Sequence, residues 1–180
     1  MCPRPTPAFS SRGFTLIELL LVMVIVAVLA TLSFPLFGLF RERARDVSCI
    51  SHLRILHVGA SSYLLDNDYI WPQMPTTVDI STSEEPMWKW WTETLMPYEV
   101  SKKHWICASE ASSYEEQYSI TSDFYGSYIP TDFDSVPNTA FMWGNQPWFI
   151  ERGQFHGPDH GPNIVMPDGS VRQGPSIFPK

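Results

Sequence analysis

Residues 13–40 read GFTLIELLLVMVIVAVLATLSFPLFGLF, and Glu18 is the only charged side chain among them. The 22 positions between Glu18 and Arg41 are uncharged, which is enough for a helix to cross a bilayer about 30 Å thick. An acidic side chain inside such an apolar helix is costly, so we expect Glu18 to have a partner for its carboxylate.

The segment Arg12-Gly13-Phe14-Thr15-Leu16-Ile17-Glu18-Leu19 resembles the processing site of type IV prepilins and of the pseudopilins of type II secretion. The resemblance implies that a membrane peptidase removes a basic leader, residues 1–13, by cutting between Gly13 and Phe14. It also implies that the same enzyme N-methylates Phe14, and that Glu18 guides assembly into a filament. Residues four apart share one face of a helix, so the new ammonium of Phe14 would lie on the same side as Glu18.

Two plainer interpretations of this segment remain beside the resemblance. A secretory signal peptide also has a basic start and an apolar core, but here Glu18 interrupts the run and Ala27–Ala30 lacks the small-x-small spacing of a cleavage site. An ordinary single-span anchor fits the length, and it is compatible with a prepilin before assembly.

The helix is predicted to continue beyond Phe40, from Phe14 to about Leu65. Apolar residues recur every three or four positions in this second half, which makes it amphipathic and in need of a partner: Val47, Ile50, Leu53, Leu56, Ala60, Tyr63 and Leu64. Pro35 removes a backbone hydrogen bond and predicts a kink. The resemblance also implies a locally melted segment at Pro35 in the filament.

The remaining sequence predicts a small β domain. Glu84-Glu85-Pro86 can start a short helix that carries Trp88, Trp91, Thr92 and Leu95 on one face and closes at Pro97. Short strand-like runs follow at Phe124–Ile129, Thr139–Trp143, Trp148–Ile150, Ile164–Met166 and Ser170–Arg172, the last two flanking the turn Pro167-Asp168-Gly169. We therefore predict an α+β fold with a long amino-terminal helix, transmembrane and then amphipathic, packed on a small antiparallel sheet. Its parts are a leader (1–13), a membrane and filament-core helix (14–40), an amphipathic half (41–66) and a globular domain (67–180).

Composition and cysteines narrow the compartment and the partners. With 12 basic and 19 acidic residues, the net charge of −7 argues against a nucleic-acid-binding surface. Cys2 would leave with the leader, and Cys49 and Cys107 would remain as an even pair in an oxidising compartment. A disulfide between them is predicted, with two buried free thiols as the alternative.

A second resemblance involves scattered residues. A subset of pilin-like proteins shows the order Cys49, Tyr63, Asp66, Pro97-Tyr98, Cys107, a histidine, Asn163 and Asp168-Gly169, with His156 or His160 as the histidine. The usual separation between that histidine and Asp-Gly is nine residues. Here it is seven from His160 and eleven from His156.

Candidate ligand sites are sparse in the sequence. His156, Asp159, His160 and Asp168 could form a metal cluster, but ordinary polar loop residues are the favoured interpretation. Two cysteines without a CxxC pattern do not predict zinc, and Asp132 with Asp134 gives only a weak calcium signal. The tryptophans predict either a core or a sugar-stacking platform, with the core favoured: Trp88, Trp90, Trp91, Trp105, Trp143 and Trp148.

These observations predict a structural subunit and not an enzyme, with no cofactor and no metal. The resemblance implies a single-pass precursor in the bacterial inner membrane with its globular domain outside the cytoplasm. Its implied partners are the prepilin peptidase, an inner-membrane assembly platform and other pilins in a homo- or hetero-oligomeric filament. A type II secretion pseudopilus is the first interpretation, a type IV pilus for adhesion or DNA uptake the second, and a membrane-tethered carbohydrate-binding module the third.

Overall fold

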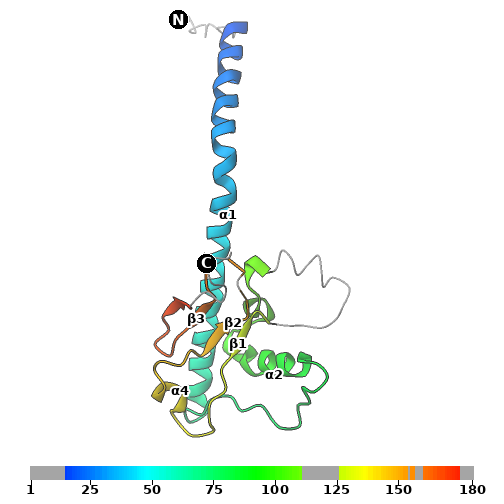
Figure 1. Cartoon of the computed structure of the whole chain (residues 1–180), viewed down its shortest axis with the longest axis vertical. Helices are drawn as coiled ribbons and strands as arrows, with labels where there is room; N and C mark the ends of the chain where they lie inside the picture. The colour runs from blue at the N-terminus through cyan, green and yellow to red at the C-terminus, as the bar shows by residue number, and fades with distance from the viewer. Residues whose placement is uncertain (1–14, 111–125, 154, 157–159, 175–180) are drawn as a thin grey trace, which may run out of the picture. The chain divides into compact units, whose positions relative to one another are not determined.

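The computed structural model describes residues 15–110, 126–153, 155–156 and 160–174, except for the side chains of 32–36 and 39. The chain divides into two units, residues 1–41 and residues 42–180, and each is described by itself. The longest helix, α1 (Leu16–Asp66), contributes residues to both units (Figure 1).

The first unit consists of the amino-terminal part of α1. Apolar side chains cover its described surface all round, and exposed fractions between 49% and 89% are found for the large ones from Leu16 to Leu29. Among the helices of the described residues, none offers a stretch long and apolar enough to cross a membrane.

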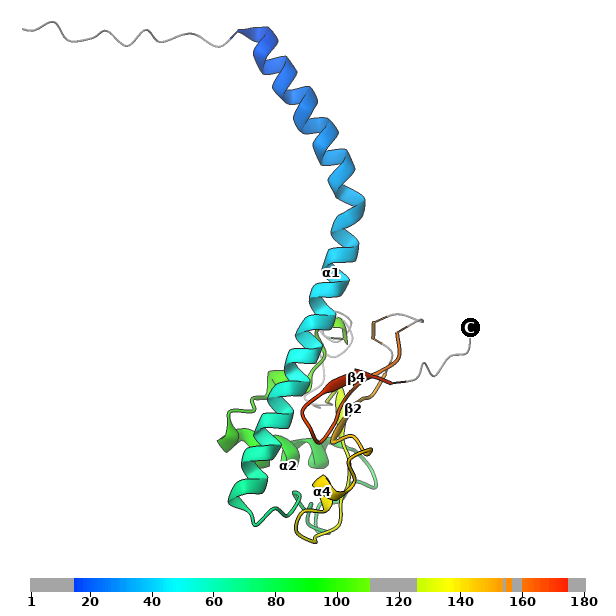
Figure 2. The same cartoon turned by 90° about the vertical axis from the view of Figure 1, so that its left-hand side faces the viewer.

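The second unit forms around residues 42–66 of α1, which lie beside the sheet and α2 (Glu85–Leu95) in both views (Figures 1 and 2). Four side chains of the predicted stripe are completely buried, as is the neighbouring Cys49: Leu53, Leu56, Ala60 and Leu64. The prediction is wrong for Val47, which is 65% exposed because it lies on the opposite side of the helix from the buried Cys49. The helix ends at Asp66, where the amide of Tyr69 donates to the carbonyl of Leu64 at 2.8 Å. The helix therefore ends near Leu65, as predicted, and the part of the stripe from Leu53 to Leu64 packs into the core.

Four short strands make one antiparallel sheet in the order β1 (Tyr128–Pro130), β2 (Phe149–Glu151), β3 (Asn163–Val165) and β4 (Val171–Gln173). Successive strand residues alternate between faces, and the first and third residues of β1, β2 and β3 are buried. The predicted α+β fold, a long helix with a small antiparallel sheet, is confirmed.

The predicted hairpin over Pro167-Asp168-Gly169 joins β3 to β4. The amide of Gly169 donates to Met166, and that of Met166 donates to Ser170, both at 2.9 Å. Gly169 has a φ of 77°, which other residues adopt only with strain, and an added Cβ would lie 3.1 Å from the ring of His57 on α1. The turn is thus fitted closely to the helix.

The prediction of a helix after Glu84 is confirmed by α2, which buries Trp88, Trp91 and Leu95 and is followed by the 3-10 turns η1 (Met96–Tyr98) and η2 (Lys102–Trp105).

The prediction of a strand over Thr139–Trp143 is wrong, because Thr139–Met142 form the one-turn helix α4. Asn138 adopts a left-handed conformation, and its carbonyl accepts from the amides of Phe141 and Met142, both at 3.0 Å. Of the predicted strand from Phe124, the first two residues lie outside the described residues.

Tryptophans fill the centre of the second unit. Trp71 contacts the rings of Trp91, Phe133, Trp148 and Phe149 at centroid distances of 5.1 to 6.1 Å. The contacts with Phe133 and Trp148 are edge-to-face, and such aromatic pairs add to the hydrophobic gain of burial. Aromatic side chains therefore supply much of the buried apolar surface that stabilises this small domain.

Candidate functional site

The first turn of α1 holds Glu18 in a reciprocal cap with Thr15. Glu18 Oε2 accepts from the amide of Thr15 at 2.9 Å and from its hydroxyl at 2.8 Å, while the amide of Glu18 donates to Thr15 Oγ1 at 3.3 Å. This is the capping box that a Thr-x-x-Glu pattern forms at a helix start. The carboxylate, which the sequence led us to expect to need a partner, has one within the same chain.

The other predicted processing residues are only partly visible. Gly13 and Phe14, the predicted cleavage and methylation positions, lie outside the described residues. Pro35 lies within the bounds of α1, and its side chain is outside the described part of the chain. The ammonium of Phe14, the predicted kink and the predicted melted segment therefore stay predictions.

The second unit brings Cys49 and Cys107 together in a disulfide, with their Cα atoms 5.0 Å apart. Both residues are completely buried. The amide of Ala108 donates to Cys49 Sγ at 3.0 Å, and the amide of Cys107 donates to the hydroxyl of Ser127 at 2.7 Å. The disulfide thus ties α1 to the segment that follows η2.

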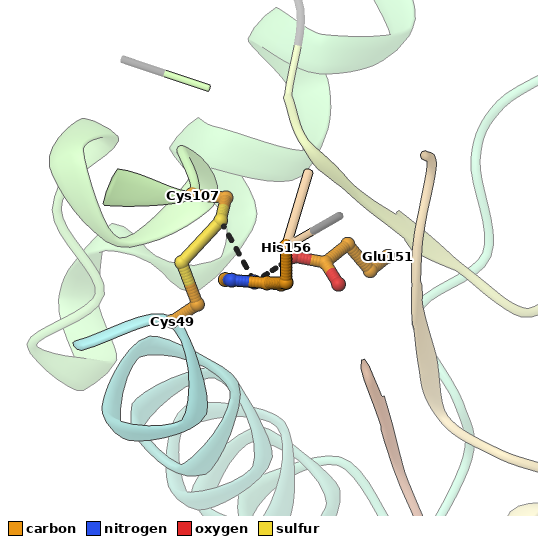
Figure 3. Close-up of side chains that lie close together, drawn as sticks. All are labelled: Cys49, Cys107, Glu151 and His156. Atoms are coloured by element: carbon orange, nitrogen blue, oxygen red, sulfur yellow. Dashed lines mark hydrogen bonds and ion pairs between the residues drawn. A yellow bond between two sulfur atoms is a disulfide. The ribbon is translucent and has the colours of Figure 1, made fainter. Parts of the chain in front are cut away.

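His156 lies between this disulfide and the carboxylate of Glu151 (Figure 3). Its Nε2 is 3.5 Å from Cys107 Sγ and 3.2 Å from Glu151 Oε1. Its Nδ1 is 3.2 Å from the hydroxyl of Ser109 and 3.7 Å from Asp46 Oδ1. Both ring nitrogens therefore have polar neighbours, although the side chain of His156 is only 4% exposed.

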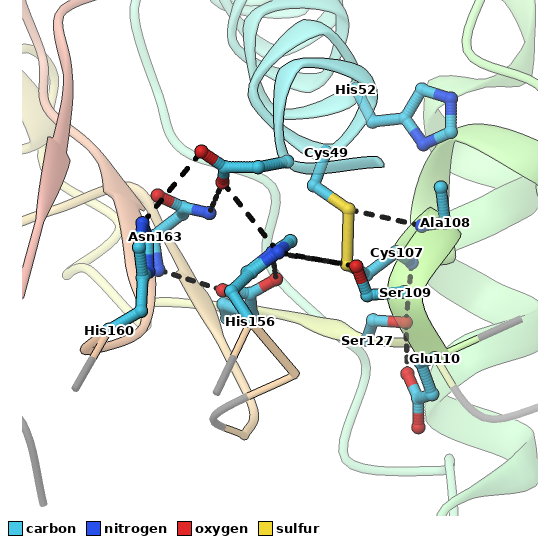
Figure 4. Close-up of polar contacts among 12 residues, drawn as sticks. Cys49, His52, Cys107, Ala108, Ser109, Glu110, Ser127, His156, His160 and Asn163 are labelled. Carbon is cyan, nitrogen blue, oxygen red and sulfur yellow. Dashed lines mark hydrogen bonds and ion pairs between the residues drawn. A yellow bond between two sulfur atoms is a disulfide. The ribbon is translucent and has the colours of Figure 1, made fainter. Parts of the chain in front are cut away.

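Asn163 links the two carboxylates of this cluster (Figure 4). Its backbone N–H donates to Glu151 Oε2 at 2.8 Å, and its side-chain Nδ2 donates to Asp46 Oδ1 at 3.1 Å. His160 lies at the edge of the same cluster, with Nε2 at 3.7 Å from Asp46 Oδ2. Helix α1, strands β2 and β3 and the loop between these strands thus meet at one polar cluster.

Electrostatics follow from this geometry. Burial disfavours the imidazolium of His156, but the hydrogen bond to Glu151 and the negative charges of Glu151, Asp46 and Glu42 outweigh burial and raise its pKa. Nearby, burial raises the pKa of Glu110, although a hydrogen bond from Ser127 opposes the change. The cluster is therefore an acidic site that favours a cation.

Sequence reasoning found some members of this cluster and missed others. His156 and His160 were singled out, whereas Asp159 lies outside the described residues and Asp168 lies in the β3–β4 turn, where it accepts from Ser170. Glu151 and Asp46 were missed. Glu151 follows two residues after the apolar Phe149 in a strand, so the period of two predicts an inward carboxylate that needs partners.

The remaining candidates do not form sites in the described part of the chain. Asp132 and Asp134 are exposed, and they belong to no described group of three or more potential metal ligands. Four of the six tryptophans proposed as a platform are in the core, Trp88, Trp91, Trp105 and Trp148, each at most 2% exposed. Because these four indoles are buried, they cannot stack on a sugar at the surface; Trp90 is half-buried, and Trp143 is 60% exposed.

Comparisons with known proteins agree with the amino-terminal motif. Residues 9–34 match the family described as "Prokaryotic N-terminal methylation motif". The chain is 34% identical over 58 residues to the type IV major pilin protein PilA of Myxococcus xanthus, covering 32% of this chain and 26% of that protein. It is 29% identical over 73 residues to the competence protein ComGC of Halalkalibacterium halodurans, covering 41% of this chain and 68% of that protein.

A third relative is the type IV wide pilus major component PilA4 of Thermus thermophilus, 30% identical over 77 residues, covering 43% of this chain and 59% of the relative. The chain thus spans about a quarter to two thirds of the length of these relatives. No solved structure is a significant match. The chain therefore carries the methylation motif and is distantly homologous to type IV pilins and to ComGC.

Proposed function

We propose that this chain is a filament subunit made as a membrane-anchored precursor. A prepilin peptidase cuts between Gly13 and Phe14 and methylates the new amino group, and residues 14–40 then carry the subunit from the membrane into the filament. The methylation motif over residues 9–34 supports processing by such a peptidase. The distant homology to pilins supports assembly with other pilins.

The observation that carries the proposal is the apolar surface of the first unit together with its one acid. Large apolar side chains that are 49% to 89% exposed along Leu16–Leu29 are unfavourable in water, because each keeps its surface hydrated. Lipid would cover them in the precursor, and the equivalent helices of neighbouring subunits would cover them in a filament. Glu18 would then distinguish correct from incorrect stacking, because an unpaired carboxylate in that apolar surrounding is penalised.

The test uses Glu18→Ala in the producing cell, with the exposed acid Glu93→Ala as the matched control. We expect Glu18→Ala to be cleaved normally but to be absent from filaments, recovered by shearing if they are on the surface and by crosslinking in the cell envelope if they are internal, and Glu93→Ala to be incorporated like wild type. Mass spectrometry of the mature chain should find N-methylated Phe14 as its first residue. A mature chain that retains residues 1–13 in cells with the peptidase, or full incorporation of Glu18→Ala, would contradict the proposal.

For the type of filament, we propose a type II secretion pseudopilus on an inner-membrane assembly platform. Its support is the resemblance of residues 12–19 to the processing site that pseudopilins share with type IV prepilins. A surface type IV pilus is the second candidate, and the relatives named as pilus components favour it. Deleting the gene for this chain distinguishes the two. If the chain forms a pseudopilus, exported enzymes should accumulate in the periplasm of the deletion strain; if it forms a pilus, the strain should lose surface filaments, adhesion or DNA uptake.

A further inference from the structure

We propose that the reduced chain binds one zinc-type divalent cation through Cys49, Cys107, His156 and Glu151, at the position that the disulfide closes. One ligand atom from each of these four residues lies within 4.8 Å of the other three. Two thiolates, an imidazole and a carboxylate are a ligand set that suits Zn²⁺ in a closed tetrahedral site. The inference does not depend on the proposed filament function.

The distances from His156 Nε2 to the sulfur of Cys107 and to the carboxylate of Glu151 already match those around a tetrahedral zinc ion. With Zn–S of about 2.3 Å and Zn–N of about 2.0 Å, tetrahedral geometry puts sulfur and nitrogen roughly 3.6 Å apart. Cys107 Sγ and His156 Nε2 are 3.5 Å apart. The same reasoning gives roughly 3.4 Å between nitrogen and oxygen, and His156 Nε2 is 3.2 Å from Glu151 Oε1. The two sulfur atoms, once reduced, need to separate to roughly 3.8 Å.

The surrounding hydrogen bonds fit metal ligation as well. A ligating histidine usually donates its other N–H to a hydroxyl or carboxylate, and Nδ1 of His156 has Ser109 at 3.2 Å and Asp46 at 3.7 Å. A ligating carboxylate is usually hydrogen-bonded in turn, and Glu151 Oε2 accepts from the amide of Asn163. The amide of Ala108 points at Cys49 Sγ, where it would support a thiolate.

Oxidation and metal binding exclude each other at this site. Binding releases one proton from each thiol and keeps both sulfurs as thiolates. Disulfide formation takes two electrons from those thiolates, forms the S–S bond and releases the cation. A disulfide-carrying protein oxidant accepts the two electrons, takes two protons from the solvent and becomes a dithiol. The cation would therefore occupy newly made chain and leave when the disulfide forms.

The experiment titrates Co²⁺, a spectroscopic stand-in for Zn²⁺, into the full chain in detergent after reduction with a phosphine. We expect one equivalent to bind with thiolate-to-cobalt charge-transfer absorption, Zn²⁺ to abolish that absorption, and oxidised chain to give none. His156→Ala and Glu151→Gln should each weaken binding by about tenfold or more. His160→Ala is the matched control, since it removes a histidine four residues away that is not a ligand, and it should bind like wild type.

Circular dichroism of each reduced variant establishes that it is folded. If His156→Ala does not fold, Glu151→Gln still tests the site, because glutamine has nearly the same shape as glutamate. Absence of charge-transfer absorption in reduced wild type would overturn the proposal. Equal affinity in wild type, His156→Ala and Glu151→Gln would also overturn it, as would a loss in His160→Ala as large as in His156→Ala.

Discussion

Removing the disulfide should destabilise the second unit by an amount that the structure allows us to calculate. Cys49 and Cys107 are 58 residues apart in sequence. The chain-entropy relation for a loop of that length gives about 14 cal/mol/K, or about 4 kcal/mol at 25 °C. We expect the double variant Cys49→Ala/Cys107→Ala to lose about this much unfolding free energy, because its denatured chain is no longer restrained.

Urea unfolding of the full chain in detergent measures the loss, with a chelator present to exclude metal. The fluorescence of the five buried tryptophans reports the transition: Trp71, Trp88, Trp91, Trp105 and Trp148. With a denaturant dependence of about 2 kcal/mol/M, the midpoint should fall by about 2 M urea. Reduced wild type is the control, since it lacks the crosslink but keeps both sulfur atoms. A difference below about 1 kcal/mol between oxidised wild type and the double variant would refute the entropic reasoning.

Three further predictions test the turn, the core and the cap. Gly169→Ala should lower the unfolding free energy by about 1–2 kcal/mol because of its positive φ, whereas Gly144→Ala, whose added Cβ meets open space, should change it little in the same urea assay. Trp148→Ala should cost about 3–5 kcal/mol because the indole is completely buried, whereas Trp143→Ala, at an exposed position, should cost under about 0.5 kcal/mol, as thermal unfolding would show. Thr15→Val should reduce incorporation into filaments, recovered by shearing or by crosslinking in the cell envelope, while cleavage continues, and Thr15→Ser, which keeps the hydroxyl, should be incorporated like wild type; equal incorporation of both would show that the hydroxyl of the cap has no part in assembly.

The sequence predicted those parts of the fold that a local period determines. The stripe from Leu53 to Leu64 and the start of α2 at Glu85 need only a helical repeat and a proline near the first turn. The β3–β4 hairpin needs only Asp168-Gly169 between two apolar runs. Each of these signals lies within a few residues of the structure it specifies.

What the sequence did not predict depends on contacts between distant segments. The run Thr139–Trp143 has the side chains of a strand, but it has no neighbouring strand in the described fold, and the backbone satisfies itself as α4. Asp46 and Asn163 are 117 residues apart and meet only because α1 packs on the sheet. A cluster of this kind appears only once the register of β2 and β3 is known.

The cap at the start of α1 changes how the role of Glu18 should be understood. The carboxylate of Glu18 already accepts hydrogen bonds from Thr15 before assembly. An unsatisfied carboxylate therefore cannot by itself be what drives the stacking of subunits. Both hydrogen bonds from Thr15, however, end on Oε2, and a carboxylate can accept on each of its two oxygens. An ammonium approaching Oε1 would therefore add to the cap without displacing it. The attraction between the Glu18 carboxylate and the ammonium grows as water is excluded. The carboxylate therefore attracts neighbouring subunits only weakly in an aqueous or headgroup environment, and it selects the correctly placed ammonium once helices close around it.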